Sequence, residues 1–214
     1  MKILITGGLG LIGSTLANSL SLLGHHITIY DNYSSGRSSY IETDAEFINL
    51  IRADLNDLSD IENEIATFDV VFHLAASGNV VESVASPIAN FENNVVTTLK
   101  LLELTRKNPD VHFIFSSTGG ALMGHAEPPI NELTLPSPIS PYGASKLACE
   151  AYIKAYAECY GLRYTIFRFG NVIGNNSLHK NGVVNKFFDL ARKGDPLPIY
   201  GEPTRDFICC RDLT

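Results

Sequence analysis

Tyr142 and Lys146 are four residues apart in "SPYGASKLACEAY", a spacing that places both side chains on one face of a helix. A tyrosine hydroxyl has an ordinary pKa of about 10, so by itself it is a poor base at neutral pH. A lysine ammonium one turn away favours the phenolate and would make the tyrosine a usable general base. Thr118, in "FIFSSTGG", could hydrogen-bond the same substrate hydroxyl. Because a lone Y-x-x-x-K occurs by chance in many helices, the surrounding elements decide whether this pair does chemistry.

A second pattern with chemical meaning lies near the N-terminus, in "KILITGGLGLIGSTLANSL". Residues 3–6 predict a buried strand, and apolar residues recur at helical spacing over 12–23. Four glycines lie in the turn and the start of the helix, at positions 7, 8, 10 and 13. A glycine turn from a strand into a helix directs backbone N–H groups and the positive helix end at an anion. We interpret the turn as a site for the pyrophosphate of a dinucleotide.

Apolar, strand-like runs alternate with longer helical patterns along most of the chain. The predicted strands are residues 3–6, 26–30, 47–52, 70–74, 111–116 and 164–169. The predicted helices are residues 12–23, 58–68, 88–106, 142–160 and 183–192. Strands that are apolar on both faces and separated by helices indicate a parallel sheet covered on both sides. The sequence therefore predicts an α/β protein with a doubly wound parallel sheet, whose ligand lies beyond the carboxyl ends of the strands.

The residues that follow the predicted strands fit a dinucleotide. Asp31 lies at the tip of the second strand, about 20 positions beyond the glycine turn, where a carboxylate can accept hydrogen bonds from the adenosine ribose. Its charge would repel a 2′-phosphate, which favours NAD over NADP. Asp54 and Leu55 follow the third strand, where an adenine edge could rest, and "LAA" after the fourth strand lets the backbone pass close to a cofactor. His73 is interpreted as a hydrogen-bonded strand histidine and not as a catalyst.

The ordered motifs carry a family resemblance. The chain resembles the extended short-chain dehydrogenase/reductase family, and within it the NAD-dependent nucleotide-sugar epimerases and dehydratases, UDP-glucose (UDP-galactose) 4-epimerases most of all. The motifs run from Lys2 to the last residue: "TGGLGLIG", "YDNYSSG", "ADL", "FHLAA", "ENNV", "FSST", "YGASK", "RFGNVIG" and "TRDFI". The resemblance implies a Rossmann-type fold with the beginning of a smaller, truncated C-terminal substrate lobe. It also implies NAD as cofactor and a nucleotide sugar, in the first instance a UDP-sugar, as substrate.

Carried over motif by motif, the resemblance implies three groups of site residues and no metal. The catalytic group is Thr118, Tyr142 and Lys146. The cofactor group follows the strand ends and consists of Gly7, Gly10, Leu11, Ile12, Gly13, Asp31, Asn32, Ser34, Ser35, Gly36, Asp54, Leu55, Leu74, Ala75, Ala76, Asn93, Ser116, Tyr142 and Lys146. The substrate group consists of Ser117, Thr118, Asn171 and Arg205, the last two matching positions that hold the diphosphate of the substrate.

The leading hypothesis for the reaction is 4-epimerisation of a nucleotide sugar through a transient 4-keto intermediate. Tyr142 would remove the proton of the 4-hydroxyl while hydride passes from C4 to NAD and then returns to the other face. A 4,6-dehydratase also needs an acid and a base beside C5 and C6. The family supplies an Asp-Glu pair for them after the threonine, where this chain has Gly119 and Gly120. A decarboxylase, a ketone reductase and a non-catalytic NAD-binding protein stay open as further alternatives.

Composition and charge indicate which classes of partner to exclude and in which compartment to expect the protein. The net charge is −7 without a basic block, which argues against nucleic acid. No stretch offers the roughly 18 uncharged apolar residues of a membrane span, and no signal peptide precedes the first strand. The four cysteines show no zinc-like or C-x-x-C spacing, so we expect free thiols in a reducing cytoplasm. Because relatives commonly dimerise through the helices that match residues 88–106 and 142–160, we expect a homodimer.

The predicted organisation is an NAD-binding Rossmann domain with the catalytic residues over 1–174 and a partial substrate-binding lobe over 175–214. Related enzymes continue beyond this point and complete the lobe, so we expect a fragment or a shortened form. Cys209 and Cys210 are expected in a strand, with a helix beginning near the last residues. The apolar residues at 187, 188, 190, 207 and 208 have too few partners in the preceding unit and are expected to be poorly covered.

Overall fold

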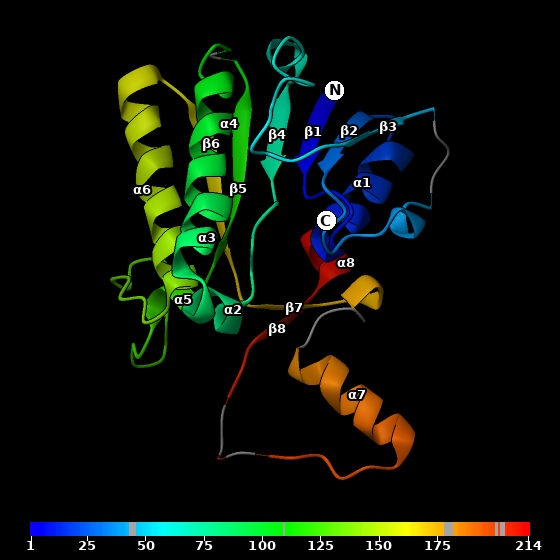
Figure 1. Ribbon diagram of the computed structural model, residues 1–214, viewed down its shortest axis with the longest axis vertical. Helices are drawn as coiled ribbons and strands as arrows, with labels where there is room; N and C mark the ends of the chain where they lie inside the picture. The colour runs from blue at the N-terminus through cyan, green and yellow to red at the C-terminus, as the bar shows by residue number, and fades with distance from the viewer. Residues whose placement is uncertain (43–45, 109, 178–181, 200, 202–203) are drawn as a thin grey trace.

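The six predicted strands form one parallel sheet. The computed structural model of the chain describes residues 1–42, 46–108, 110–177, 182–199, 201 and 204–214. Its strands are β1 (Lys2–Thr6), β2 (His26–Asp31), β3 (Ile48–Arg52), β4 (Val70–His73), β5 (His112–Thr118) and β6 (Arg163–Phe169). They lie in the order β3-β2-β1-β4-β5-β6, with every neighbouring pair parallel (Figure 1). This is the strand order of a Rossmann-type sheet, with its switch point between β1 and β4, so the predicted fold class is confirmed.

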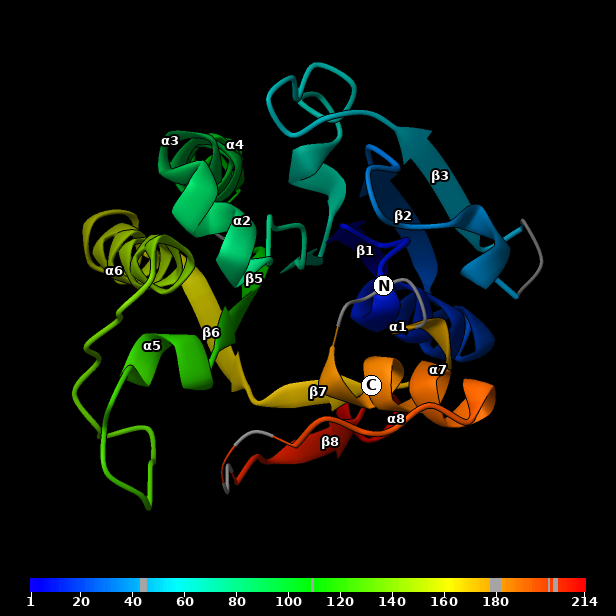
Figure 2. The same ribbon diagram turned by 60° about the horizontal axis from the view of Figure 1, so that its bottom comes forward.

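Helices pack on both faces of this sheet and divide its core in two. Alternate residues of β1 point to opposite faces: Ile3 and Ile5 join a cluster with α1 (Leu11–Leu22), whereas Leu4 joins the larger cluster. The larger cluster contains Phe113 and Phe115 of β5 together with residues of α4 (Thr97–Thr105) and α6 (Pro141–Tyr160). Figure 2 shows α4 and α6 on one side of the sheet and α1 on the other. Buried apolar side chains on alternate strand positions therefore fix which strand residues face which layer.

Most of the predicted helices form close to their expected bounds. The segments 12–23, 142–160 and 183–192 correspond to α1, α6 and α7 (Val183–Lys193). The segment 88–106 forms as α3 (Pro87–Phe91), a π-helical stretch (Glu92–Val96) and α4, joined end to end. Two short helices, α2 (Val80–Ala85) and α5 (Gly120–Met123), are additional to the prediction, and short 3-10 turns cover Ser38–Tyr40, Ile65–Thr67 and Asn175–Ser177.

The helix predicted over residues 58–68 is wrong. This segment folds as successive turns, in which the N–H groups of Ile61, Glu64 and Thr67 donate to carbonyls three residues earlier. Just before it, the carboxylate of Asp57 accepts from the backbone N–H of Ser59 at 3.1 Å, a contact of the kind that caps a helix start, yet no regular α-helix follows. The apolar residues are nevertheless buried as expected, since Ile61, Ile65 and Phe68 are at most 4% exposed. Helical spacing here predicts burial correctly and the backbone conformation incorrectly.

The last part of the chain forms a small second sheet beside the first. β7 (Asn171–Ile173) pairs in parallel with β8 (Phe207–Cys209), and α8 (Cys210–Leu213) follows at once and contacts α1. Cys209 therefore lies in a strand as expected, whereas Cys210 begins a helix. The buried thiol of Cys210 donates to the Leu11 carbonyl at the start of α1 at 3.5 Å. The predicted lobe over 175–214 includes residues 178–181, 200 and 202–203, which lie outside the described residues. The proposed boundary at 174 stays a prediction, although β7 precedes it and β8 follows it.

The expected poor coverage of the C-terminal apolar residues is confirmed at two of the five positions, whereas Phe187, Leu190 and Ile208 are half-buried. Phe188 of α7 is 60% exposed and Phe207 of β8 is 44% exposed. In α7, whose residues are all described, no side chain is buried. Figure 1 shows α7 away from the six-stranded sheet, beyond the β7–β8 pair.

Candidate active site

The glycine turn after β1 is shaped by close backbone contacts. Gly7 has a φ of +67°, a conformation that side chains other than glycine rarely adopt. A Cβ atom at Gly7 would lie 2.7 Å from the backbone of Ala75, which follows β4, and one at Gly13 would lie 2.5 Å from the Gly7 carbonyl oxygen. The turn, the start of α1 and the end of β4 therefore lie so close together that only glycine fits at Gly7 and Gly13. Together they form a backbone cradle at the N-terminus of α1.

Asp31, at the end of β2, fixes this turn from the side. Its carboxylate is 8% exposed and accepts hydrogen bonds from the backbone N–H of Leu9 at 3.0 Å and of Tyr33 at 2.8 Å. Gly36 lies against Leu9 as well, since a Cβ at Gly36 would come within 2.5 Å of it. The sequence predicted only a ribose contact for Asp31, so its role in holding the glycine turn was missed. A carboxylate has about four lone-pair positions, which leaves capacity for a further donor.

The residues after β3 form a polar cluster with Asn32. The Asp54 carboxylate accepts from the side-chain amide of Asn32 at 2.8 Å and from both amide groups of Asn56 at 2.8 Å. These hydrogen bonds, that from Asn32 foremost, lower the pKa of Asp54. Leu55 is buried beside this cluster, whereas Ser34 and Ser35 are exposed on the loop after β2. The structure thus brings the loops after β2 and β3 together.

The loop after β4 is held by a residue that sequence reasoning did not select. Asn93 was predicted to line the cofactor groove, and its side chain is exposed. Its neighbour Asn94 is buried, accepts from the N–H of Ser77 at 2.7 Å and donates to the Ser145 hydroxyl at 3.0 Å. Asn94 therefore ties the "LAAS" loop to α6 next to Lys146. Both asparagines belong to the "ENNV" motif, and the pattern alone does not tell which of them is turned inward.

Thr118, Tyr142 and Lys146 come together at the carboxyl end of β5. The Thr118 side chain hydrogen-bonds the Tyr142 hydroxyl. Ser140 caps α6 through its bond to the Gly143 N–H at 3.2 Å, and Pro141 follows at the first helical position, so the helix begins next to Tyr142. The predicted helical spacing is confirmed, because Tyr142 and Lys146 lie one turn apart on α6.

The electrostatics of this trio differ from the sequence expectation. Lys146 is 2% exposed, donates to the Ser116 carbonyl at 2.7 Å and lies 4.5 Å from the centre of the Phe115 ring. Burial lowers the pKa of Lys146 to about 8. Burial also raises the pKa of Tyr142 to about 12, more than the hydrogen bond from Thr118 lowers it. In this arrangement the ammonium is directed at Ser116 and desolvation dominates at Tyr142, so the lowering of the Tyr142 pKa by Lys146 stays a prediction.

His73 behaves as the sequence predicted, as a buried and fully bonded histidine. Its Nδ1 lies 2.7 Å from the Thr6 hydroxyl and its Nε2 lies 2.9 Å from the Thr98 hydroxyl. Burial lowers its pKa to about 3, so the ring is neutral at physiological pH. The ring joins β1, β4 and α4 below the glycine turn and takes the role of a structural link.

The predicted substrate residues are divided between two environments. Ser117 is 4% exposed and donates its hydroxyl to Glu150, a residue of α6 that the sequence analysis did not select. Asn171 and Arg205 are exposed, and Asn171 donates to the Asp206 carbonyl at 3.0 Å. The parallel pairing of β7 with β8 brings the segments of these two residues side by side. The structure thus gathers Asn171 and Arg205 in one region and turns Ser117 into the protein interior.

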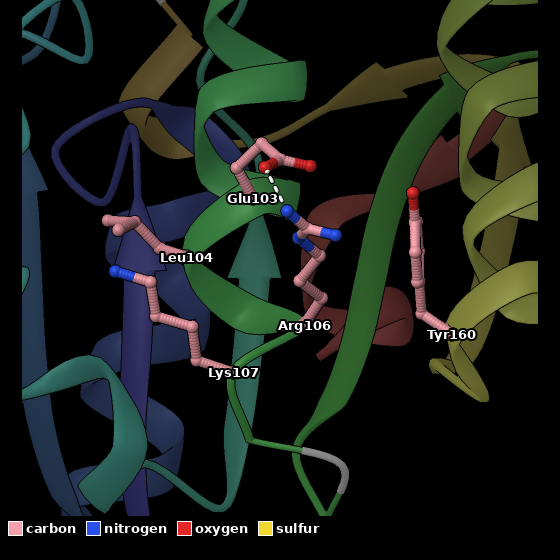
Figure 3. A pocket seen from close by; sticks show the side chains of 5 residues that line it. All are labelled: Glu103, Leu104, Arg106, Lys107 and Tyr160. Carbon is pink, nitrogen blue, oxygen red and sulfur yellow. Dashed lines mark hydrogen bonds and ion pairs between the residues drawn. The ribbon is translucent and has the colours of Figure 1, made fainter.

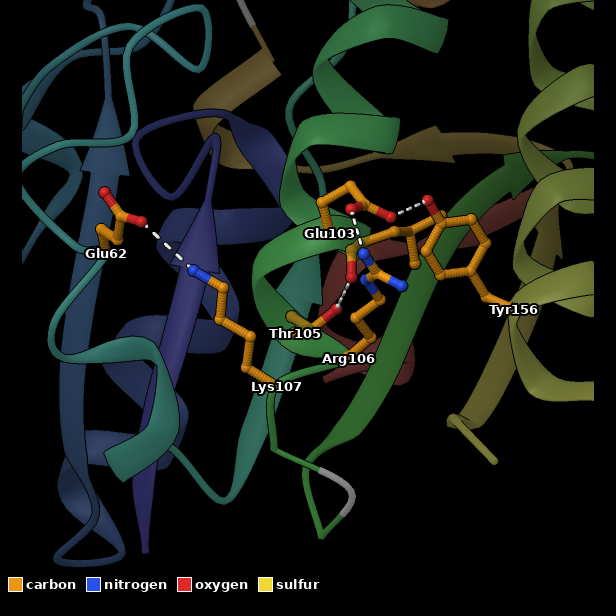
Figure 4. A network of polar contacts seen from close by, with 7 residues as sticks. Glu62, Glu103, Thr105, Arg106, Lys107 and Tyr156 are labelled. Carbon is orange, nitrogen blue, oxygen red and sulfur yellow. Dashed lines mark hydrogen bonds and ion pairs between the residues drawn. The ribbon is translucent and has the colours of Figure 1, made fainter. Parts of the chain in front are cut away.

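A surface hollow lies far from this trio. It has a volume of about 520 Å³ and is lined by Glu103, Leu104, Arg106, Lys107 and Tyr160 at the C-terminal ends of α4 and α6 (Figure 3). Its charges already have partners, because Arg106 pairs with Glu103 at 2.7 Å and Lys107 with Glu62 at 3.2 Å (Figure 4). Tyr142 and Tyr160 are separated by about 27 Å along α6. The hollow is therefore not part of the candidate active site.

The described part of the chain offers neither a membrane-spanning helix nor a metal-ion cluster. Within it, no helix is both long and apolar enough to cross a membrane. The same residues contain no group of three or more His, Cys, Asp and Glu side chains that could hold a metal ion.

A Rossmann-type sheet with a glycine turn and a Tyr–Lys pair on the helix after β5 defines a class of dinucleotide-dependent enzymes. The profile of the "NAD dependent epimerase/dehydratase family" matches residues 3–214, and the chain belongs to this family. Among curated proteins, a putative UDP-glucose 4-epimerase of Methanocaldococcus jannaschii is 39% identical over 99% of this chain and 70% of its own length.

Solved structures agree with this membership. A UDP-N-acetylglucosamine 4-epimerase from Methanobrevibacter ruminantium, in complex with UDP-N-acetylmuramic acid, is 36% identical with a TM-score of 0.92, covering 99% of this chain and 70% of that one. A UDP-glucose 4-epimerase from Thermus thermophilus, in complex with NAD, is 33% identical with a TM-score of 0.88, covering 100% and 72%. The chain thus spans about 70% of the length of each of these relatives.

Proposed function

We propose that the protein is an NAD-dependent nucleotide-sugar 4-epimerase. The observation that carries the proposal is the meeting of Thr118, Tyr142 and Lys146 at the carboxyl end of β5, beside the glycine cradle. These are the groups that can move a proton on a sugar hydroxyl, and they adjoin the place where a parallel α/β sheet binds a dinucleotide. The family membership and the named 4-epimerases among the relatives support this reading.

The cofactor residues fit NAD by their backbone shape and charge. Gly7, Gly10 and Gly13 with the start of α1 would hold the pyrophosphate, since a Cβ at Gly7 or Gly13 would collide with neighbouring backbone. Asp31 and the Asn32–Asp54 pair would receive the adenosine, and the carboxylate of Asp31 favours NAD over NADP. Bound NAD would supply a reversible acceptor for the hydride of the sugar C4. Comparable affinities for NAD and NADP, measured by calorimetry, would contradict this assignment.

Tyr142 is proposed to take the proton of the sugar 4-hydroxyl. It would return this proton after the 4-keto sugar has rotated in the site and presented its other face to the hydride. With a pKa of about 12 the tyrosine is protonated at neutral pH, so the reaction requires additional positive charge or hydrogen bonds at its oxygen. The Thr118 hydroxyl already provides one such hydrogen bond, and the Lys146 ammonium, one turn away, is the nearest proposed source of charge. Thr118 would also orient the substrate hydroxyl.

A 4,6-dehydratase is the competing reaction within the same family. It needs an acid and a base for the elimination across C5 and C6, and Thr118 is followed by Gly119 and by Gly120 at the start of α5. Glycine has no side chain that can transfer a proton, so the residues after Thr118 favour the epimerase. A non-catalytic NAD-binding protein would bind the cofactor and leave every sugar unchanged.

The decisive experiment is incubation with NAD and a panel of UDP-, GDP-, CDP- and dTDP-sugars, followed by NMR. We expect interconversion of 4-epimers, most readily among UDP-sugars, without net consumption of NAD. Tyr142→Phe should lower turnover by ~10²-fold or more, the usual scale for a lost general base, and leave NAD binding largely unchanged. Full activity of this variant would contradict the mechanism, and 4-keto-6-deoxy products would assign the protein to the dehydratases.

We further propose a division of labour and a homodimer. Residues 1–174 would hold NAD and the catalytic groups, and residues 175–214 would contribute to the nucleotide sugar. The dimer would form through α3, α4 and α6, where Ile88 is 74% and Phe91 51% exposed. Exposed apolar area of this kind commonly marks a contact between chains. Sedimentation at increasing concentration tests the dimer, and Ile88→Asp should weaken it.

A further inference from the structure

A buried ion pair adjoins the proposed catalytic residues along the chain. Glu150 of α6 is 1% exposed and accepts two hydrogen bonds from Arg168 of β6, at 3.0 Å from Nε and 2.7 Å from Nη2. The Ser117 hydroxyl donates to the same carboxylate at 2.6 Å. Ser117 directly precedes Thr118, and Glu150 follows Lys146 by four residues on one helix face. One carboxylate therefore joins the helix of Tyr142 and Lys146 to the strand end of Thr118.

Stability alone is a weak reason for this arrangement. Removing two charges from water is costly, and buried ion pairs can often be replaced by apolar residues without loss of stability. The Arg168 guanidinium also reaches the Glu132 carbonyl at 3.4 Å, in the loop before α6. The pair thus gathers β5, β6, α6 and this loop around one buried negative charge, which points to a role in placing or charging the neighbouring groups.

The neighbouring group that needs a negative charge is Lys146. Its ammonium is buried against the Ser116 carbonyl and the Phe115 ring, which are neutral partners. Two groups on α6, Cys149 and Glu150, act against the desolvation of Lys146. Burial raises the pKa of the Cys149 thiol, which is therefore neutral near pH 7, so the charge of Glu150 is the effective one.

Other titratable groups packed around Lys146 do not supply that charge. His73, which reaches this region from β4, is neutral because burial lowers its pKa to about 3. Tyr142, one turn before Lys146 on α6, is neutral because burial raises its pKa to about 12. Arg168 from β6 carries a positive charge that partly cancels that of Glu150.

We propose that Glu150 is a positioning residue of this site: its carboxylate holds the Thr118 strand end through Ser117 and keeps the Lys146 ammonium protonated. Arg168 then sets how much of the negative charge acts on Lys146. The consequence for turnover rests on the proposed function, whereas the effect on Lys146 is a property of the folded chain. Glu150 and Arg168 have opposite predicted effects on the titration midpoint of Lys146. A purely structural role of the pair would not produce opposite effects.

The test is an NMR titration of the full chain labelled with ¹³C at the lysine Cε atoms, with Lys146→Arg to assign the signal. Glu150→Gln should lower the midpoint of Lys146 by about one pH unit, because it removes a nearby opposite charge. Arg168→Gln should raise the midpoint, because it leaves the carboxylate uncompensated. Ser117→Ala removes the hydroxyl contact without changing any charge and should leave the midpoint unchanged.

The outcomes distinguish this inference from the proposed function. Equal or same-direction shifts in Glu150→Gln and Arg168→Gln, with both variants folded by circular dichroism, would overturn it. If Glu150→Gln does not fold, the double variant Glu150→Gln/Arg168→Gln is compared with Arg168→Gln, and a lower midpoint in the double variant is expected. Equal midpoints in that pair would overturn the inference. Because the titration needs no substrate, lack of epimerase activity would contradict the proposed function and leave the role of Glu150 standing.

Discussion

The two halves of the proposed site are built in different ways. Tyr142 and Lys146 lie on α6, which packs on the main core, and Lys146 is 2% exposed. Asn171 and Arg205 lie at the small β7–β8 pair, and both side chains are exposed. Beside that pair, no residue of α7 is buried. The catalytic half is thus shaped by side chains that fold the domain, and the proposed substrate half by side chains that barely contribute to it.

This difference follows from what each half has to do. A general base needs a defined pKa and orientation, and burial among fixed neighbours supplies both, as the shifted pKa values of Tyr142 and Lys146 illustrate. Groups that grip a diphosphate need charge and hydrogen-bond donors, which exposed side chains can offer. Regions with few buried contacts also open more easily than the core. We therefore expect changes in the two halves to separate stability from substrate binding.

The largest contrast should come from two phenylalanines. Phe113→Ala removes a fully buried ring from the core below α6, and should lower the free energy of unfolding by about 3–5 kcal/mol. Phe188→Ala removes a ring that is 60% exposed on α7, and should change it by less than about 0.5 kcal/mol. Urea unfolding of both variants measures the difference. Similar losses for the two would mean that α7 is an integral part of the core.

The same contrast governs what the sequence could predict. The strand and helix pattern of the core half follows from buried residues such as Phe113 and Phe115, whose spacing is visible in the chain. The glycine turn and the Tyr142–Lys146 spacing were likewise recognisable, because backbone shape and helix geometry dictate them. The buried partners were not: Asn94, Glu150 and Arg168 bond across elements that are far apart in sequence. Their roles depend on tertiary contacts. The pKa of Tyr142 depends on tertiary contacts as well, because burial is the largest influence on it.

A smaller effect is expected at the glycine turn that opens the catalytic half. Gly7→Ala places a Cβ 2.7 Å from the Ala75 backbone at a φ of +67°, which should cost about 1–3 kcal/mol or more and weaken NAD binding. Gly24→Ala is the matched control, because Gly24 has a φ of +79° and open space around its Cβ position. Thermal unfolding and NAD calorimetry should therefore show the backbone strain in both variants and the loss of cofactor binding only in Gly7→Ala.

The buried His73 predicts a dependence of stability on pH. Its pKa is about 3 in the folded protein against an ordinary 6.5, so the unfolded chain binds the proton more readily between these values. The stability that neutral His73 contributes is complete above pH 6.5 and should fall by about 1.4 kcal/mol for each pH unit below it, down to pH 3. Urea unfolding of the unchanged protein and of His73→Asn from pH 7 to 4 measures this contribution of His73 to the free energy of unfolding. A constant difference between the two proteins over that range would contradict the prediction.

The smallest effect on the fold is expected at Arg205, where the proposed substrate half can be tested by itself. Because its side chain is exposed, Arg205→Gln should change the free energy of unfolding by less than about 0.5 kcal/mol and leave NAD affinity unchanged. Binding of a UDP-sugar should weaken about tenfold or more, since a charge-assisted bond to phosphate contributes about 1.5–3 kcal/mol. Arg192→Gln, an exposed arginine at the end of α7, controls for the overall change in charge. Calorimetry with NAD and then with a UDP-sugar compares the variants. Equal losses at Arg192 and Arg205 would show a general electrostatic effect and remove Arg205 from the proposed site.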